Sequence, residues 1–103
     1  MAAPKPILVV DDNAAIRELW ADALTDVGYQ VLTAGNGRDA LMLMRAVIPD
    51  FIVLDLRMPE MDGPEFLGVL QRSPGFRYIP VLIVTAFPED AALLAVKGLR
   101  IVG

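Results

Sequence analysis

The chain contains no cysteine and no histidine among its 103 residues. Their absence excludes disulfides, thiol nucleophiles, Ser-His-Asp triads and the usual zinc sites. Hydroxyl groups are scarce too, because Ser73 is the only serine and there are three threonines. The thirteen acidic residues, against nine basic ones and a formal net charge of -4, therefore carry most of the chemistry available to this protein.

Two further features are missing from the sequence. The Lys and Arg residues are scattered singly, so we expect no basic patch and no direct nucleic-acid binding. No apolar run approaches the ~18 residues of a membrane span, and residues 1–6 do not have the long apolar core of a signal peptide. We expect no membrane segment and a cytoplasmic location, with which the absence of cysteine is consistent.

Apolar runs of strand length alternate along the chain with segments of helical periodicity. Residues 7–10, 51–54 and 80–84 are almost entirely apolar, which is typical of strands buried on both faces of a parallel sheet. Residues 29–34 include polar side chains and are predicted to form an edge strand. Helices are predicted between these strands and from about residue 88, followed by a fifth strand at residues 100–103. The alternation predicts an α/β fold with a parallel sheet and right-handed crossovers.

Local signals predict where the helices begin and end. Asn13 and Asp62 are interpreted as N-terminal caps, and Gly28 as the stop of the first helix. The second helix is expected over about residues 38–47. In the first helix, Arg17 is expected on the solvent side. The opposite, apolar face of that helix is expected to comprise Ile16, Leu19, Trp20, Ala23, Leu24 and Val27.

Polar side chains follow three of the buried strands. Asp11 and Asp12 come after the first, Asp55 after the third and Thr85 after the fourth. The carboxyl ends of parallel strands meet at one edge of the sheet, which is where ligands bind in open α/β folds. Three carboxylates in one pocket repel each other and call for a cation. Their oxygen ligands suit Mg²⁺ or Mn²⁺.

Asp55 is the candidate reactive group in this cluster. A carboxylate can attack phosphorus to give an acyl phosphate. The Thr85 hydroxyl could then bind a phosphoryl oxygen, and Ala86 leaves room for the group. Simpler explanations are that Asp55 opens a turn, that Asp12 caps a helix and that Thr85 fills a strand. They leave the alignment of these residues at one edge unexplained.

Residues 7–12, 53–63 and 80–86 together resemble the response-regulator receiver domains of bacterial two-component signalling. The resemblance implies a flavodoxin-like, doubly wound parallel sheet with strand order 2-1-3-4-5. It also implies that a histidine kinase donates a phosphoryl group to Asp55. By the same resemblance, Asp12 and Asp55 would bind Mg²⁺ directly, Asp11 would act mostly through water, and the backbone carbonyl of Arg57 would be a further ligand. Thr85 would be the switch hydroxyl.

The end of the sequence departs from this family pattern. The family has a Lys-Pro pair after the fifth strand, an aromatic residue on that strand and then a fifth helix. Lys97 cannot supply the lysine, because it precedes Gly98 and belongs to the predicted fourth helix. We therefore expect residues 1–103 to form a single receiver domain that is incomplete at its C-terminus, with the last helix missing.

A missing last helix would leave one sheet face uncovered. Apolar residues exceed the about 45–50% share of ordinary domains, which points the same way. We expect this face to pair with a second copy of the chain or with a partner domain. Depending on the phase of the pleat, the uncovered residues would come from Ile7, Val9, Ile52, Leu54, Leu82 and Val84.

The sequence thus favours a phosphoacceptor switch that does not turn over a separate substrate. Arg57 and Phe87 are expected to overhang the pocket and slow hydrolysis of the acyl phosphate. The alternative is a pseudo-receiver that acts only as a protein-protein interaction module, which the missing lysine favours and the acidic trio opposes. A nucleotide-binding fold is disfavoured because the turn after the first strand is acidic rather than glycine-rich. A carboxylate phosphatase is disfavoured because no second aspartate follows Asp55 closely.

Overall fold

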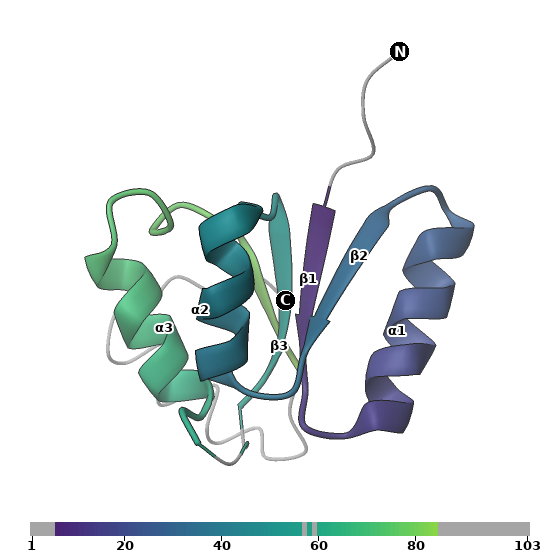
Figure 1. The fold of residues 1–103 in the computed structure, drawn as a ribbon, viewed down its shortest axis with the longest axis horizontal. Helices are drawn as coiled ribbons and strands as arrows, with labels where there is room; N and C mark the ends of the chain where they lie inside the picture. Colours follow the sequence, from purple (N-terminus) through teal and green to yellow (C-terminus); the bar gives the residue numbers. More distant parts are fainter. Residues whose placement is uncertain (1–5, 57, 59, 85–103) are drawn as a thin grey trace.

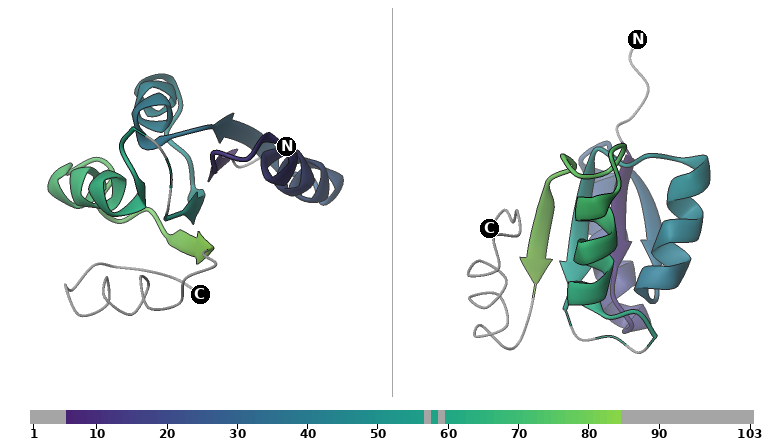
Figure 2. Two further views of the ribbon diagram at one scale, coloured as in Figure 1. Left: turned by 90° about the horizontal axis from the view of Figure 1, so that it is seen from below. Right: turned by 90° about the vertical axis from the view of Figure 1, so that its left-hand side faces the viewer.

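The computed structural model describes residues 6–56, 58 and 60–84. Within them, a four-stranded parallel sheet has the strand order β2-β1-β3-β4 (Figure 1). Among the described helices, α1 covers one face of the sheet, and α2 and α3 cover the other (Figure 2, left). The elements are β1 (Pro6–Val10), α1 (Ala14–Asp26), β2 (Gln30–Ala34), α2 (Gly37–Ala46), β3 (Phe51–Asp55), α3 (Gly63–Arg72) and β4 (Val81–Val84).

This architecture confirms the doubly wound α/β fold and the strand order 2-1-3-4. The strand predicted from its polar residues, β2, does lie at an edge of the sheet. The predicted fourth helix and fifth strand lie outside the described residues. Element bounds differ from the predictions by a residue or two: Asp55 is the last residue of β3 itself, and α2 already begins at Gly37.

The face under α2 and α3 holds the main core. From the sheet, Leu8, Val10, Ile52 and Leu54 all have 0% exposure. The two helices bury apolar side chains against them, so the structure assigns Ile52 and Leu54 to this covered face rather than to the opposite one. The helix residues buried here are Ala40, Met44, Phe66, Leu67 and Leu70.

The face under α1 is packed differently. Its buried cluster consists of Ile7, Val9 and Val53, with Trp20, Leu24, Val31, Phe51 and Val84 partly buried against it. No residue of α1 is fully buried. Leu19 and Val27 remain 65% and 70% exposed and Ala23 is exposed too, so the expected place of these three residues on the buried face was wrong. Helical periodicity fixes the direction of an apolar stripe, but the width of the stripe that is covered depends on tertiary packing.

The helix ends follow their sequence signals. The Asn13 side chain accepts a hydrogen bond from the Ile16 backbone N–H at 3.2 Å, and the Asp62 side chain accepts one from Glu65 N–H at 3.0 Å. Both predicted caps are therefore confirmed. Gly28 has a φ of 100°, a conformation that glycine adopts at little cost, and this places the stop of α1 as expected.

Candidate functional site

The acidic residues after β1 and at the end of β3 meet at the carboxyl edge of the sheet. Val10 pairs with Leu54 in adjacent parallel strands, so the residues that follow them, Asp11 and Asp55, come side by side. One carboxylate oxygen from each of Asp11, Asp12 and Asp55 lies within 4.8 Å of the others. Asp11 is 9% exposed, whereas Asp12 is exposed and Asp55 half-buried, so the cluster is open to solvent on one side.

Asp11 is held at three points. Its backbone N–H donates to the Ala34 carbonyl at 3.1 Å, which extends the β1–β2 pairing by one residue. Its Oδ1 accepts from Asn13 N–H at 2.9 Å. Its carbonyl oxygen accepts from Nη1 of Arg17 at 2.7 Å. The backbone and side chain of Asp11 are therefore fixed before any ligand is considered.

The connection from Asp55 to α3 is also closed by backbone hydrogen bonds. Gly63 N–H donates to the Leu56 carbonyl at 2.9 Å, and Gly37 N–H, at the start of α2, donates to Met61 at 3.0 Å. Glu60 and Met61 have φ angles of 49° and 23°, which side-chain-bearing residues rarely adopt. Glu60 and Met61 thus adopt a strained backbone conformation, and the start of α2 helps to hold Met61 in place.

The chemistry of this donor set fits a hard divalent cation. The cluster offers carboxylate oxygens and no sulfur or imidazole ligand, and its exposed side leaves room for water. Bringing three negative charges this close without a counterion costs electrostatic free energy, which a bound cation would remove. Asp11, Asp12 and Asp55 are the residues that could hold it.

Several residues of the sequence hypothesis lie outside the described residues. These are Arg57, Thr85, Ala86 and Phe87, so their places around the cluster remain expectations. Val84 pairs with Asp55 across β3 and β4, which is the last described position before Thr85.

Arg17 and Met61 contribute to the site but were not predicted from the sequence. Arg17 is half-buried and bonded to Asp11, so its assignment to the solvent side was wrong. One feature of the sequence could have indicated Arg17. It lies six residues after Asp11, which is near enough for a long side chain to reach back to the end of β1. Met61 gives no comparable signal, because methionine is not a residue that sequence rules associate with positive φ.

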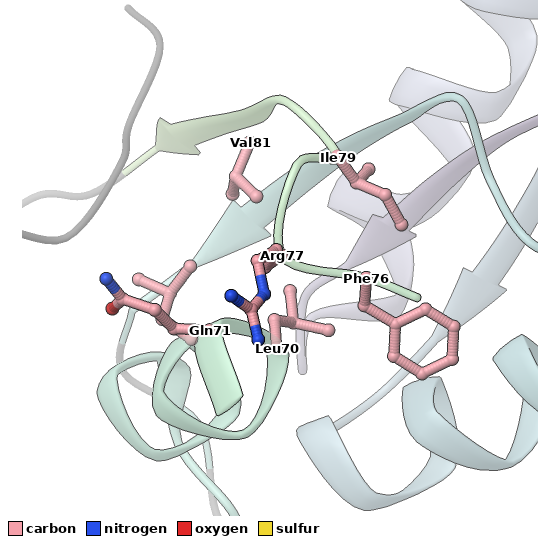
Figure 3. A pocket seen from close by; sticks show the side chains of 7 residues that line it. Leu70, Gln71, Phe76, Arg77, Ile79 and Val81 are labelled. Atoms are coloured by element: carbon pink, nitrogen blue, oxygen red, sulfur yellow. The ribbon is translucent and has the colours of Figure 1, made fainter. Parts of the chain in front are cut away.

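Two hollows lie away from the acidic edge. An apolar groove of ≈ 370 Å³ on the α1 face is lined by Ile7, Trp20, Leu24, Tyr29, Asp50, Phe51, Val53 and Leu82. A cavity of ≈ 40 Å³ lies between the last turns of α3 and residues 76–81 (Figure 3). The small cavity borders the first residue of β4, at the opposite edge from Asp55, and has room for only a water or two.

Comparison with known proteins decides the family. The model of the response regulator receiver domain matches residues 7–103. The chain belongs to this family. It is therefore a signalling domain of two-component systems, and the sequence resemblance is confirmed.

Named relatives agree with this assignment. The chain is 43% identical over 83 residues to the probable transcriptional regulator ycf27 of Porphyra purpurea, covering 81% of this chain and 33% of that protein. It is 38% identical over 84 residues to the polar-differentiation response regulator DivK of Brucella anthropi, covering 82% of this chain and 68% of that protein. The chain spans about a third of the length of the ycf27 relative.

Solved structures of receiver domains share the fold. The chemotaxis protein CheY4 of Vibrio cholerae superposes with a TM-score of 0.85 at 33% identity, covering 96% of this receiver domain and 84% of that chain. The response regulator TrrA of Thermotoga maritima, solved in complex with Mg²⁺ and BeF, gives a TM-score of 0.82 at 32% identity, with coverages of 94% and 83%. Among the described residues, no helix combines the length and hydropathy that crossing a membrane requires.

Proposed function

We propose that this receiver domain is a phosphoacceptor switch in which Asp55 takes a phosphoryl group from the phosphohistidine of a histidine kinase. The observation that carries the proposal is the convergence of Asp55 with Asp11 and Asp12 within 4.8 Å at the carboxyl edge of the sheet. A carboxylate oxygen of Asp55 forms a bond to phosphorus, the phosphorus–nitrogen bond of the donor breaks, and the electron pair stays on the imidazole, which takes up a proton from water as it leaves. The half-buried place of Asp55 leaves it open to such a donor.

The acidic trio is proposed to hold Mg²⁺ or Mn²⁺. Asp12 and Asp55 would bind the cation directly, Asp11 mostly through water, and the Arg57 backbone carbonyl would complete the protein ligands. The bound cation would offset the negative charge that Asp55 and the phosphoryl oxygens bring together. The Mg²⁺ and BeF named with the TrrA structure support this choice of cation for a relative of the same fold.

Residues outside the described part of the chain are assigned the remaining roles. Thr85 is proposed as the switch hydroxyl that binds a phosphoryl oxygen, with Ala86 leaving space beside it. Arg57 and Phe87 are proposed to shield the acyl phosphate from water. The protein would act in the cytoplasm and transfer the group to itself rather than turn over a separate substrate.

The competing proposal is a pseudo-receiver that serves only as a protein-protein interaction module. The apolar groove of ≈ 370 Å³ on the α1 face favours an interaction role, because grooves of this kind are filled by partner side chains. A second copy of the chain or a partner domain is the proposed occupant. An interaction surface does not require three carboxylates to converge elsewhere, so the phosphoacceptor reading explains more of the structure.

Intact mass spectrometry separates the two proposals. The protein is treated with acetyl phosphate and Mg²⁺, and one added phosphoryl group is expected. Asp55→Asn should abolish the addition, because the amide is not a usable nucleophile. Asp50→Asn is the matched control, since Asp50 lies just before the opposite end of β3 and is exposed. Phosphorylation that persists in Asp55→Asn would overturn the assignment, and an unmodified wild type would favour the interaction module.

A further inference from the structure

Arg17 joins three separate segments of the chain. Its backbone belongs to the first turns of α1, where its N–H donates to the Asn13 carbonyl at 3.0 Å. Its side chain reaches back across the start of the helix, where Nη1 donates to the carbonyl oxygen of Asp11 at 2.7 Å. The guanidinium therefore lies beside the residue that follows β1, although the backbone of Arg17 belongs to a helix that covers one face of the sheet.

The third segment is the connection between β2 and α2. A Cβ atom placed on Gly35 would lie 3.4 Å from Nη1 of Arg17 and 4.0 Å from its Cζ, so the guanidinium lies against the backbone just after β2. Arg17 also lines two surface hollows, of ≈ 490 and ≈ 250 Å³, and Thr33 of β2 borders both. The side chain therefore lies between α1 and the end of the edge strand.

These contacts act on the geometry of the acidic trio. The turn from β1 to α1 carries Asp11 and Asp12, and both carboxylates converge with Asp55 only if this turn keeps its shape. The bonds from Asp11 to Ala34 and Asn13 fix the turn from two sides, and Arg17 fixes it from a third. We propose that Arg17 is a positioning residue, whose hydrogen bond to the Asp11 carbonyl and contact with Gly35 hold the acidic trio in a cation-binding arrangement.

The charge of Arg17 makes this role testable. A guanidinium close to the trio repels an incoming cation, so charge alone predicts that removing Arg17 tightens cation binding. Positioning predicts the opposite, because groups that orient metal ligands typically contribute about 10- to 100-fold to affinity. The hydrogen bond goes to a carbonyl and not to a carboxylate, so Arg17 orders the site without occupying one of its proposed ligand oxygens.

The first experiment uses isothermal titration calorimetry to measure Mn²⁺ binding by the wild type and by the variants Arg17→Met and Arg17→Lys. Arg45→Met is the matched control, because Arg45 is an exposed arginine in the last turn of α2 and its loss changes the net charge equally. This step rests on the proposed cation site. We expect about tenfold or greater weakening in Arg17→Met, a smaller weakening in Arg17→Lys, and no weakening in the control. Unchanged or tighter binding in Arg17→Met would overturn the proposal.

The second experiment needs no cation and therefore stands even if the proposed function fails. Amide hydrogen exchange is followed by NMR in the metal-free protein at Asp11 and Asn13, with Ile52 in the core strand as the reference for global opening. Arg17→Met should accelerate exchange at Asp11 and Asn13 more than at Ile52, whereas Arg45→Met should not. Equal acceleration at all three amides would reduce Arg17 to a general stabiliser and refute its positioning role.

If wild type binds no Mn²⁺, the proposed cation site is wrong, and exchange alone judges whether Arg17 orders the turn. If Arg17→Met does not fold, Arg17→Lys carries both readouts, because lysine keeps the charge but cannot reproduce the planar guanidinium. Binding and exchange in Arg17→Lys that both match wild type would then refute the proposal.

Discussion

The two faces of the sheet are made from the same strands but are packed to different depths. On the α2–α3 face, the four inward residues of β1 and β3 have 0% exposure and meet buried side chains from both helices. On the α1 face, no residue of the described helix is fully buried, and a groove of ≈ 370 Å³ lies beside it. The sheet is thus tightly packed on one side and only partly covered, among the described residues, on the other.

This difference shows which part of the molecule supports the acidic site. The loop beside Asp55 is fixed from the tightly packed side, through Gly37 of α2 and Gly63 of α3. The turn that carries Asp11 and Asp12 is held by the hydrogen bonds that link Asp11 to Ala34 and to Asn13, and by Arg17, which reaches over from α1. Hydrogen bonds therefore hold both halves of the site, but those beside Asp55 come from the backbone of two well-packed helices, whereas one of those beside Asp11 comes from a long side chain on a half-exposed helix.

The largest expected effect comes from the tightly packed face. Phe66 of α3 has 0% exposure and belongs to the main core. Phe66→Ala should lower the free energy of unfolding by about 3–5 kcal/mol, from lost transfer free energy and the cavity left behind. Urea denaturation followed by circular dichroism measures it. A loss below about 1 kcal/mol would mean that this face is as loosely packed as the other.

Divalent cations should produce the next largest effect on stability, because a bound cation would contact carboxylates from both the β1–α1 turn and the end of β3. Binding to the native state alone stabilises it by about 2.7 kcal/mol at a hundredfold excess over Kd. Thermal denaturation with and without Mg²⁺ should show this gain in the wild type and lose most of it in Asp12→Ala. A melting temperature that millimolar Mg²⁺ leaves unchanged would argue against the cation site.

Close backbone packing around Gly63 gives an intermediate effect. A Cβ atom on this residue would lie 2.6 Å from Cα of Leu56 and 3.0 Å from the Asp55 carbonyl oxygen, so the loop beside Asp55 would have to shift. Gly63→Ala should cost about 1–3 kcal/mol in the free energy of unfolding.

Gly68 provides the control within the same helix. A Cβ atom there would meet Nη1 of Arg72 at 3.2 Å, at the tip of a flexible side chain that can move away. Gly68→Ala should therefore be neutral or stabilising by up to about 1 kcal/mol, from helix propensity. Urea denaturation measures the free energy of unfolding of both variants. Equal losses would show that the close contact of Gly63 with Asp55 and Leu56 does not explain the cost of Gly63→Ala.

Much of this arrangement could be predicted from sequence. Unbroken apolar runs indicate strands with two covered faces, and polar residues at the ends of parallel strands must meet at one edge. These two rules predicted a parallel sheet and the convergence of Asp11, Asp12 and Asp55, whereas the strand order was implied by the resemblance to receiver domains. The caps at Asn13 and Asp62 were predictable because they depend only on neighbours three residues away.

The depth of packing on each face could not be predicted in the same way. The pleat phase that buries Ile52 and Leu54 under α2 and α3 follows from register and crossover geometry, which the alternation of elements leaves open. The exposure of Leu19 depends on how much of the sheet α1 covers. The role of Arg17 depends on the path of a long side chain, and polarity alone assigns such residues to solvent.

The smallest expected effect concerns two leucines of α1. Leu19 is 65% exposed, so Leu19→Ala should change the free energy of unfolding by no more than about 0.5 kcal/mol. Leu24 lines the apolar groove and is half-buried. Its replacement by alanine should cost about 1 kcal/mol, well below the cost of the same deletion in a fully buried core.

If a second copy of the chain binds on the α1 face, the free-energy cost of substitutions on that face should depend on protein concentration. If the groove is covered by another chain, the native assembly gains free energy from association, and the penalty of Leu24→Ala should grow as protein concentration rises. The penalty of Phe66→Ala, which lies on the opposite face, should not change beyond the shift common to all variants. Urea denaturation at several concentrations, with light scattering, makes the comparison. A constant Leu24 penalty and a monomeric mass throughout would exclude self-association through this groove and would leave a partner domain as its proposed occupant.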